Sequence, residues 1–460
     1  VANGLDQEAG QELDRQIFFG EPLAEAVDAG RVSEARLDEM VERILFGMID
    51  AGVMDAPVVL SAQPIDYDAH AEVAQRAAEA GIVLLKNDRM TLPLASTAGR
   101  IVVIGGHADV GVLSGGGSSQ VRSVGGAPIE IPLTSGAASS FARVTYHASS
   151  PVNAIRATAP GAEVSFIDGS DPAAAARAAT GADAVIIFAT QWTTEAQDAE
   201  TLSLPDNQDA LIAAVAAVNP HTTVVLETGG PVLMPWIDAV PAVLQAWYPG
   251  QRGGEAIARI LFGQANPSGH LPITFPRSAE QAPRPTPPGL EALKASDAAS
   301  NAGSGSAAEF RSFPVAYVEG SDVGYRWYER EGRVPLFPFG HGLSYTRFEY
   351  GALSVEGGDD LTVSFDVTNT GDRAGTDVPQ LYVAPEGQPR RLAGWSRLTL
   401  QPGESRRVTI TAEPRIVADY DTTLPGWGIS PGIYRVQVGH DALDNALGGE
   451  AVLSSRTMKP

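Results

Sequence analysis

The chain has no cysteine among its 460 residues, which excludes disulfide bridges and metal sites built from thiolates. No run of apolar residues is long enough to cross a bilayer, so we expect no membrane insertion. The glycine-rich stretch that begins at Ile104 contains neither GxGxxG nor GxxxxGK followed by Ser or Thr. It therefore gives little support to nucleotide binding, which needs such spacings to bring backbone amides around a phosphate.

Positive charge is scarce, because Lys and Arg number 32 against 55 for Asp and Glu, for a formal net charge of −23. This excess of negative charge disfavours nucleic acid and anionic membranes as partners and suggests a soluble protein that acts on a neutral molecule. His107, in the glycine-rich stretch, has no partner at metal-binding spacing. We therefore expect neither a metal ion nor another cofactor.

The most informative stretch is a polar loop between two apolar segments. Residues 184–189 form a Val- and Ile-rich run without polar alternation, which predicts a strand buried on both faces of a parallel sheet. Residues 211–218 are apolar at helical spacing, and Asp206 and Asn207 are suitable N-caps for that helix. The loop between them follows the carboxyl end of a strand, which is where open α/β sheets bind ligands.

Three carboxylates, Glu195, Asp198 and Glu200, stand within six residues of this loop. Like charges at that spacing are expected to raise the pKa of at least one carboxyl, which then keeps a proton for general acid catalysis. A solvated surface glutamate in an acidic protein is the simpler alternative. Trp192 precedes Glu195 by three residues, and its ring is suited either to stacking on a sugar or to closing the end of the strand.

Between residue 56 and about residue 280, short apolar runs alternate with helical patterns. The predicted strands are 81–86, 101–105, 164–168, 184–189, 223–227 and 243–247, and the predicted helices are 69–80, 210–218 and 254–261. This alternation predicts a mainly parallel α/β sheet with helices on both faces. Residues 278–310, rich in Pro, Ala, Ser and Gly, are interpreted as a linker or a long surface loop.

After residue 348 the pattern changes to strict alternation. The alternating apolar residues are Leu361, Val363, Phe365 and Val367, and the turn residues N-T-G-D follow them. Similar short strands are predicted at 381–383, 407–410 and 434–438. The pattern indicates a β-sandwich of the fibronectin type III kind. The aromatic residues within 325–329 and 335–345 favour packing between domains.

Near the amino terminus an amphipathic helix is predicted, with Ser33 as a suitable N-cap and Gly52 as a suitable stop. Its apolar residues share one face and are Leu37, Met40, Val41, Ile44, Leu45 and Met48. A single amphipathic helix has no core of its own, so we interpret it as a helix that docks on another domain.

The polar loop reads E-x-x-D-x-x-x-L-x-L-P and runs into N-Q-D-A-L-I. This pattern resembles the acid/base loop of glycoside hydrolase family 3, the β-glucosidase family. The matching positions are Glu195, Asp198, Leu202, Leu204, Pro205 and Gln208. The family often has Gly after the glutamate and Arg after the aspartate, where this chain has Ala196 and Ala199. The resemblance implies that Glu195 is the proton donor and that Asp198 and Glu200 shape the loop.

Further stretches resemble the same family in the same order. Residues 249–276 are similar to the closing helix and loop of its α/β sandwich domain, and residues 335–345 to the start of its third domain. The G-G-G-S-S sequence is similar to a loop that faces the family's barrel. The resemblance implies that Ser118, Ser119 and Gln120 contact an outer sugar subsite, with a purely structural role in the turn as the alternative.

Residues 1–20 resemble the last turn of the family's amino-terminal barrel through G-L-D and F-G-x-P-L, which implies that Phe18 and Phe19 lie near the barrel mouth. In the family the nucleophile is an aspartate in a motif like S-D-W, upstream of G-L-D. No such motif precedes Gly4, and Asp6 belongs to G-L-D itself. The resemblance therefore implies a nucleophile on a barrel outside these residues.

The fold class expected is α/β followed by all-β. Residues 1–55 are assigned to the end and exit helix of a barrel, 56–345 to an α/β sandwich domain and 346–460 to a fibronectin-like β-sandwich. The implied function is that of a retaining β-glycoside hydrolase, first of all a β-glucosidase that acts on β-linked glucosides or oligosaccharides together with the missing barrel. The alternatives are a β-xylosidase or dual-specificity enzyme, and a non-catalytic carbohydrate-binding or scaffold protein.

Overall fold

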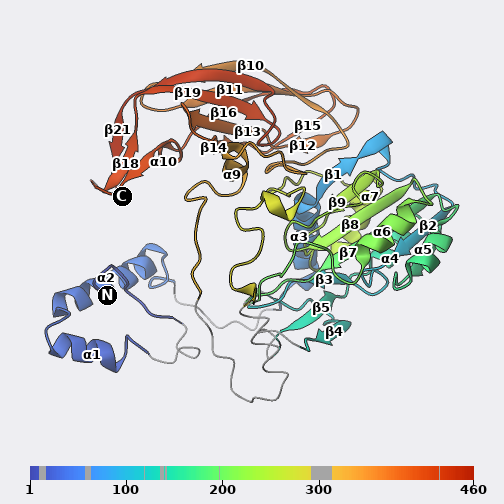
Figure 1. The fold of residues 1–460 in the computed structure, drawn as a ribbon, viewed down its shortest axis with the longest axis horizontal. Coiled ribbons are helices and arrows are strands. Elements are labelled where there is room, and N and C mark those ends of the chain that lie inside the picture. The colour runs from blue at the N-terminus through green and yellow to red at the C-terminus, as the bar shows by residue number, and fades with distance from the viewer. Residues whose placement is uncertain are drawn as a thin grey trace. The chain divides into compact units, whose positions relative to one another are not determined.

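The computed structural model describes residues 1–9, 17–56, 64–118, 120–134, 139, 142–195, 197–291, 313–423 and 425–459 (Figure 1). The chain divides into two compact units, Val1–Asp66 and Tyr67–Pro460. Residues 292–312, which hold most of the predicted linker, lie outside the described residues.

The described part of the first unit contains helices α1 (Glu21–Asp28) and α2 (Glu34–Asp50). Ser33 caps α2 as predicted, because its side chain accepts a hydrogen bond from the Arg36 amide at 3.1 Å. The Arg36 guanidinium pairs with Asp6 at 2.5 Å and lowers the pKa of that carboxyl. Four residues of the predicted apolar face are exposed, namely Val41, Ile44, Leu45 and Met48.

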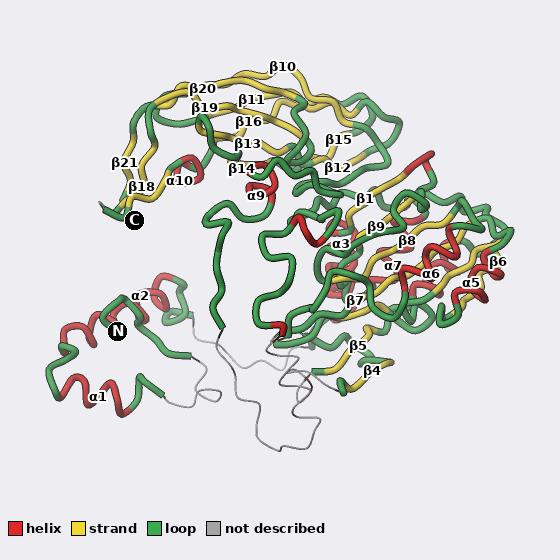
Figure 2. The backbone as a smooth tube through the Cα atoms, viewed as in Figure 1, coloured by secondary structure: helices red, strands yellow, loops and turns green. Residues whose placement is uncertain are grey.

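The α/β part of the second unit is built on a six-stranded sheet with the order β1-β9-β8-β7-β2-β6 (Figure 2). Its strands are β1 (Val83–Asn87), β2 (Arg100–Ile104), β6 (Glu163–Ile167), β7 (Ala184–Gln191), β8 (Thr222–Thr228) and β9 (Ala242–Gln245). All neighbours pair in parallel except β1, which runs antiparallel to β9. Each strand overlaps one predicted from the apolar runs, so the mainly parallel sheet is confirmed.

Helices cover both faces of this sheet. On one face α3 (Tyr67–Gly81), α4 (Pro151–Thr158) and α7 (Gly253–Leu261) share a core with the strands. On the other face α5 (Pro172–Ala179) and α6 (Gln208–Ala216) do the same. The reason lies in the central strands, which are apolar on both sides and are buried only when two helical layers enclose them.

The start of α6 differs from the prediction. Asn207 does occupy the N-cap position, but its φ is 58° and its side chain makes no capping hydrogen bond. A capping side chain requires an extended backbone at the N-cap, so the left-handed conformation prevents Asn207 from reaching the first-turn amides. The preceding residue, Asp206, is also left-handed, with φ of 55°. The two residues therefore form a tight turn into the helix and do not cap it as predicted.

A small antiparallel sheet was not predicted. It consists of β3 (Val112–Ser114), β5 (Arg143–His147) and β4 (Ile129–Pro132), paired in that order. These strands are short and separated by glycine-rich or polar segments, so they carry too few alternating residues to be recognised from the sequence.

The rest of the second unit is an all-β part. Its strands are β10 (Phe348–Glu356), β11 (Thr362–Asn369), β12 (Gly375–Asp377), β13 (Gln380–Pro385), β14 (Arg391–Trp395), β15 (Leu398–Leu400), β16 (Ser405–Thr411), β17 (Asp419–Asp421), β18 (Gly426–Ile429), β19 (Gly432–Gly439), β20 (Leu447–Leu453) and β21 (Arg456–Met458), with the short helix α10 (Pro414–Val417). The sheets β10-β11-β16 and β14-β13-β19-β20 bury their inner faces in one core. The predicted alternation is confirmed on β11, where Val363, Phe365 and Val367 are fully buried.

The chain returns to the edge of the six-stranded sheet before it enters the β-sandwich. The Leu343 amide donates to the Leu84 carbonyl of β1 at 2.9 Å, and Nε2 of His341 lies 2.9 Å from the Leu85 carbonyl oxygen. The segment that precedes β10 thus extends along β1, the outermost strand.

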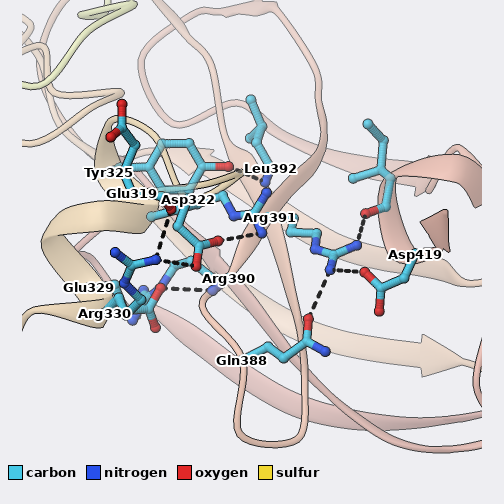
Figure 3. Close-up of polar contacts among 12 residues, drawn as sticks. Glu319, Asp322, Tyr325, Glu329, Arg330, Gln388, Arg390, Arg391, Leu392 and Asp419 are labelled. Carbon is cyan, nitrogen blue, oxygen red and sulfur yellow. Dashed lines mark hydrogen bonds and ion pairs between the residues drawn. The ribbon is translucent and has the colours of Figure 1, made fainter. Parts of the chain in front are cut away.

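Helix α9 (Tyr325–Arg330) joins the α/β part to the β-sandwich. On the α/β side, Nε1 of Trp327 donates at 3.0 Å to the carbonyl of Gln281, the last residue of the short helix η3 (Ala279–Gln281). On the sandwich side, the Tyr325 hydroxyl accepts from the Leu392 amide at 2.8 Å, and the Glu329 carboxylate accepts from Nε of Arg390 at 3.1 Å (Figure 3). The expectation that these aromatic residues pack between domains is thereby met, since Tyr325 also contacts the buried ring of Tyr382.

We predict that Arg390→Met destabilises the second unit. Methionine keeps much of the apolar stem, but the half-buried Glu329 carboxylate loses the guanidinium and keeps only the residue 390 amide, and the Ala442 carbonyl loses the guanidinium donor at 2.8 Å. Such losses cost about 1–3 kcal/mol in the free energy of unfolding, measurable by urea denaturation. The control is Arg406→Met, which removes the exposed pair with Glu404 and should cost at most about 0.5 kcal/mol. Equal effects of the two substitutions would contradict the role given to Arg390.

Candidate active site

The loop that carries Glu195 leaves the carboxyl end of β7 and returns into α6. Gln208 closes its base, because the Gln208 side chain accepts from the Thr190 amide and donates to the Thr190 carbonyl, both at 2.8 Å. Leu204 is buried against the sheet core, and the Leu202 carbonyl accepts from the Leu233 amide at 2.8 Å. The apolar and glutamine positions of the motif therefore anchor the loop, while its three carboxylates are exposed.

Tyr248 holds the first residues of this loop through two hydrogen bonds of its hydroxyl. Its hydroxyl donates to the Gln191 carbonyl at 2.8 Å and accepts from the Thr193 amide at 2.8 Å. Burial raises the pKa of this hydroxyl, which therefore stays protonated and able to donate. The sequence analysis missed Tyr248, which follows β9 and had no spacing relation to the Glu195 loop.

The glycine-rich loop 115–118 lies directly against the Glu195 loop. The Gly116 amide donates to the Thr193 carbonyl at 2.9 Å. A Cβ atom on Gly116 would stand 2.4 Å from the Trp192 ring, and one on Gly117 would stand 2.4 Å from Cβ of Glu195. Neither position has room for a side chain, so the glycines are required by the close approach of the two loops. No phosphate-binding role is needed to explain them.

Ser118 holds the Glu195 carboxylate. Its amide donates to Oε2 of Glu195 at 2.7 Å, and its hydroxyl contacts the same oxygen. These hydrogen bonds lower the pKa of Glu195, because they favour the charged carboxylate. The sequence had suggested that repulsion raises the pKa of at least one of the three loop carboxyls, and Glu195 is not that carboxyl.

The other predicted site residues are distributed over several places. Trp192 is half-buried, and its Nε1 is enclosed without a hydrogen-bond partner among the described residues. Gln120 donates to the Gly115 carbonyl at 3.0 Å and lines a cavity of about 370 Å³ next to the loop. Ser119 lies outside the described residues. Phe18 and Phe19 belong to the first unit, where their amides donate to the Glu8 carboxylate.

A second cavity, of about 400 Å³, opens at the junction of the two loops. Its lining residues are Gly115, Gly116, Thr193, Thr194, Gly229, Trp247 and Tyr248. The Thr194 hydroxyl is buried there without a hydrogen-bond partner in the described part of the chain. Such a space, lined by glycines, threonines and two aromatic side chains, suits a neutral polar molecule.

One carboxyl near this site was missed entirely. Glu227 lies on β8 with none of its surface exposed, and its Oε2 accepts from the Leu113 amide at 2.8 Å. Burial raises the pKa of Glu227 to about 8. The available sequence signal was a single charged residue at the end of the otherwise apolar run T-V-V-L-E.

The described residues contain no cluster of three or more His, Asp or Glu that is arranged to hold a metal ion. His107 instead packs edge-on against Tyr146, with ring centroids 4.9 Å apart. Among the same residues, no helix combines the length and apolar character needed to span a membrane.

Comparison with known proteins identifies the family of both parts of the second unit. Residues 82–345 match the glycosyl hydrolase family 3 C-terminal domain, and residues 377–442 match the fibronectin type III-like domain. The chain is also similar to thermostable beta-glucosidase B of Acetivibrio thermocellus, with 34% identity over 99% of this chain and 58% of that protein.

Solved structures show the same relationship. The GH3 beta-glucosidase of Bifidobacterium adolescentis is 30% identical, with a TM-score of 0.76 over 96% of this chain and 61% of that one. A beta-glucosidase from Streptomyces venezuelae in complex with D-glucose is 28% identical, with a TM-score of 0.77 over 99% of this chain and 70% of that one. The 460 residues thus span 58% of the length of the curated relative. Because the family model alone matches more than half of the chain, the chain belongs to glycosyl hydrolase family 3.

Proposed function

We propose that these residues supply the acid/base half of the active site of a retaining β-glucosidase, with Glu195 as the proton donor. The observation that carries this proposal is the fixed position of the Glu195 carboxylate, held by Ser118 on a glycine loop that packs against its own loop. Proton transfer to a leaving oxygen depends on such positioning. The similarity to proteins named beta-glucosidases favours a β-glucoside over a β-xyloside as the substrate.

In the proposed mechanism, a carboxylate outside these residues attacks the anomeric carbon while Glu195 protonates the departing oxygen. Glu195 then removes a proton from water as the water oxygen attacks the anomeric carbon and displaces the carboxylate, which releases the sugar with its original configuration. Retention requires the two carboxyl groups about 5–5.5 Å apart. We propose that the nucleophile comes from a barrel, and that Phe18 and Phe19 lie near its mouth.

Ser118 has a definite electrostatic role in this scheme. As Glu195 gives up its proton, negative charge develops on its carboxyl group, and the two hydrogen bonds from Ser118 stabilise that charge. The same bonds favour the carboxylate that later acts as the base. Trp192 would stack on a sugar and Ser118, Ser119 and Gln120 would contact an outer sugar subsite, while Asp198 and Glu200 shape the loop.

The first prediction concerns the 460-residue chain by itself. We expect it to hydrolyse no aryl β-glucoside, because attack on the anomeric carbon lacks its carboxylate. The assay uses strictly pure chain and a chromogenic glucoside. Appreciable turnover would overturn the proposal that the nucleophile lies outside these residues.

The second prediction concerns Glu195→Gln in the enzyme that includes the barrel. Glutamine keeps the size of the side chain but cannot deliver a proton, so turnover of cellobiose should fall about 10²–10⁴-fold. Formation of the glycosyl-enzyme should be nearly spared for a dinitrophenyl glucoside, whose leaving group needs no proton. The intermediate should then accumulate as a burst, and azide, which needs no base, should restore turnover and yield a β-glucosyl azide.

Matched controls for that experiment are Asp198→Asn and Glu200→Gln. Neither should show leaving-group dependence or azide rescue. If Glu200→Gln shows both and Glu195→Gln shows neither, the proton donor has been assigned to the wrong carboxylate.

The third prediction concerns Ser118→Ala. Loss of the hydroxyl removes a hydrogen bond that favours ionised Glu195, so the pKa of Glu195 should rise. The alkaline limb of kcat/KM for an alkyl glucoside reports this proton and should move to higher pH. Ser123→Ala serves as the control, because the Ser123 hydroxyl contacts His147 and not Glu195. An unchanged or lowered limb in Ser118→Ala would refute the electrostatic role of Ser118.

A further inference from the structure

Glu227 is a buried carboxyl that the proposed mechanism does not use. It occupies the sixth position of β8, where the preceding residues Val224, Val225 and Leu226 are all buried in the two cores of the sheet. In the sheet register it stands opposite Thr190 of β7, one residue before the end of that strand. It therefore lies at the carboxyl edge, beneath the place where the Glu195 loop begins.

The contacts of Glu227 point toward the glycine loop. Oε2 accepts from the Leu113 amide at 2.8 Å, whereas Oε1 is buried with no partner among the described residues. Leu113 is the central residue of β3, and Ser118 follows it by five residues. The Glu227 side chain therefore links the six-stranded sheet to β3, the strand that leads to Ser118 and that also pairs with β5.

The glycine loop and the strand that leads into it are held by contacts from two other elements. Before the apex, Leu113 is bound to Glu227, and within it the Gly116 amide is bound to the Thr193 carbonyl at 2.9 Å. With no Cβ contacts of their own, three consecutive glycines do not define their own position. The position of Ser118 relative to Glu195 therefore depends on these two contacts, together with the pairing of β3 with β5 and the Gln120–Gly115 hydrogen bond.

We propose that Glu227 is a positioning residue of the acid/base site, acting through β3 and the glycine loop on the hydrogen bonds that Ser118 gives to Glu195. This role rests on the proposed function of Glu195. Glu227 touches no substrate in this scheme and takes no part in proton transfer.

The protonation of Glu227 gives this role a pH dependence. Burial raises its pKa to about 8, so the carboxyl is neutral at pH 7 and ionises just above it. The groups that face it are the Leu113 amide on β3, Tyr146 on β5 and Tyr248 after β9, and burial holds the pKa of both tyrosines above the ordinary value. On neighbouring elements, the His147 ring of β5 forms a hydrogen bond with the Ser123 hydroxyl. The Glu255 carboxylate of α7 accepts one from the Ser149 hydroxyl. Ionisation of Glu227 thus places a buried charge next to β3, and none of these groups in the described part of the chain is a cation bonded to it.

The first test measures the pKa of Glu195 in the 460-residue chain by NMR of ¹³C-labelled glutamate carboxyl groups, with Glu195→Gln to assign the resonance. Glu227→Gln, whose amide oxygen still accepts from Leu113, should leave this pKa unchanged. Glu227→Leu removes the acceptor and should raise the pKa at least as much as Ser118→Ala does. In the double variant Glu227→Leu/Ser118→Ala the two shifts should not add, because both act through Ser118.

The control is Asn219→Leu, because Asn219 lies shortly before Thr222, the first residue of β8, at the end of the strand far from Glu227. The Asn219 side chain is buried and donates to the Ala179 and Ala182 carbonyls, so its loss also removes buried hydrogen bonds. It should lower the melting temperature without changing the pKa of Glu195. If Asn219→Leu raises that pKa as much as Glu227→Leu does, Glu227 has only a general structural role and the proposal fails.

The second test needs no destabilising variant. In the unsubstituted chain, the Ser118 amide resonance should show an inflection near pH 8, where Glu227 ionises, and this inflection should be absent in Glu227→Gln. A resonance without that inflection in the unsubstituted chain overturns the proposal. Both tests report on Glu195 and Ser118 without catalysis, so they stay decisive even if Glu195→Gln shows that Glu195 is not the proton donor.

Discussion

The close approach of two loops at the carboxyl edge of the sheet is the constraint on which the site depends. Gly116 and Gly117 lie so near Trp192 and Glu195 that a single added carbon atom would overlap with them. This contact brings Ser118 to the Glu195 carboxylate, and it excludes any larger residue from the two glycine positions. The order of the strands makes it possible, because β7 and β8 end side by side beneath both loops.

Two carboxyl groups near this edge have pKa values that are shifted in opposite directions by their surroundings. Glu195 is exposed and receives two hydrogen bonds, so its pKa is lowered, whereas Glu227 is enclosed by apolar strands, so its pKa is raised. Neither shift comes from the repulsion among loop carboxylates that the sequence suggested. Hydrogen bonding and burial decide both cases, and both depend on residues far away in the chain.

The sequence was sufficient for the layers of the fold, and its resemblance to a family led to the proposal that Glu195 is the proton donor. Buried parallel strands are unbroken apolar runs and sandwich strands alternate, so β7 and β11 were predicted from local pattern alone. The antiparallel direction of β1 was not predictable, since an apolar run has no direction. Tyr248 and Glu227 were missed for a related reason, because Tyr248 follows β9 and Glu227 lies on β8, and neither has a sequence spacing to Glu195. The left-handed turn at Asn207 likewise depends on the loop that it closes.

The segment around Leu343 determines when, during synthesis, the β1 edge of the sheet is protected from aggregation. It bonds to β1, an outer strand of the six-stranded sheet, yet it lies more than two hundred residues later in the chain. Until that segment has been synthesised, the free backbone groups of β1 are open to any other strand, as at every unprotected sheet edge. The six strands of the sheet can thus pair with one another early, whereas the segment that covers the β1 edge is synthesised late. A ribosome-bound chain must keep that edge apart from its neighbours for the time needed to translate the intervening residues.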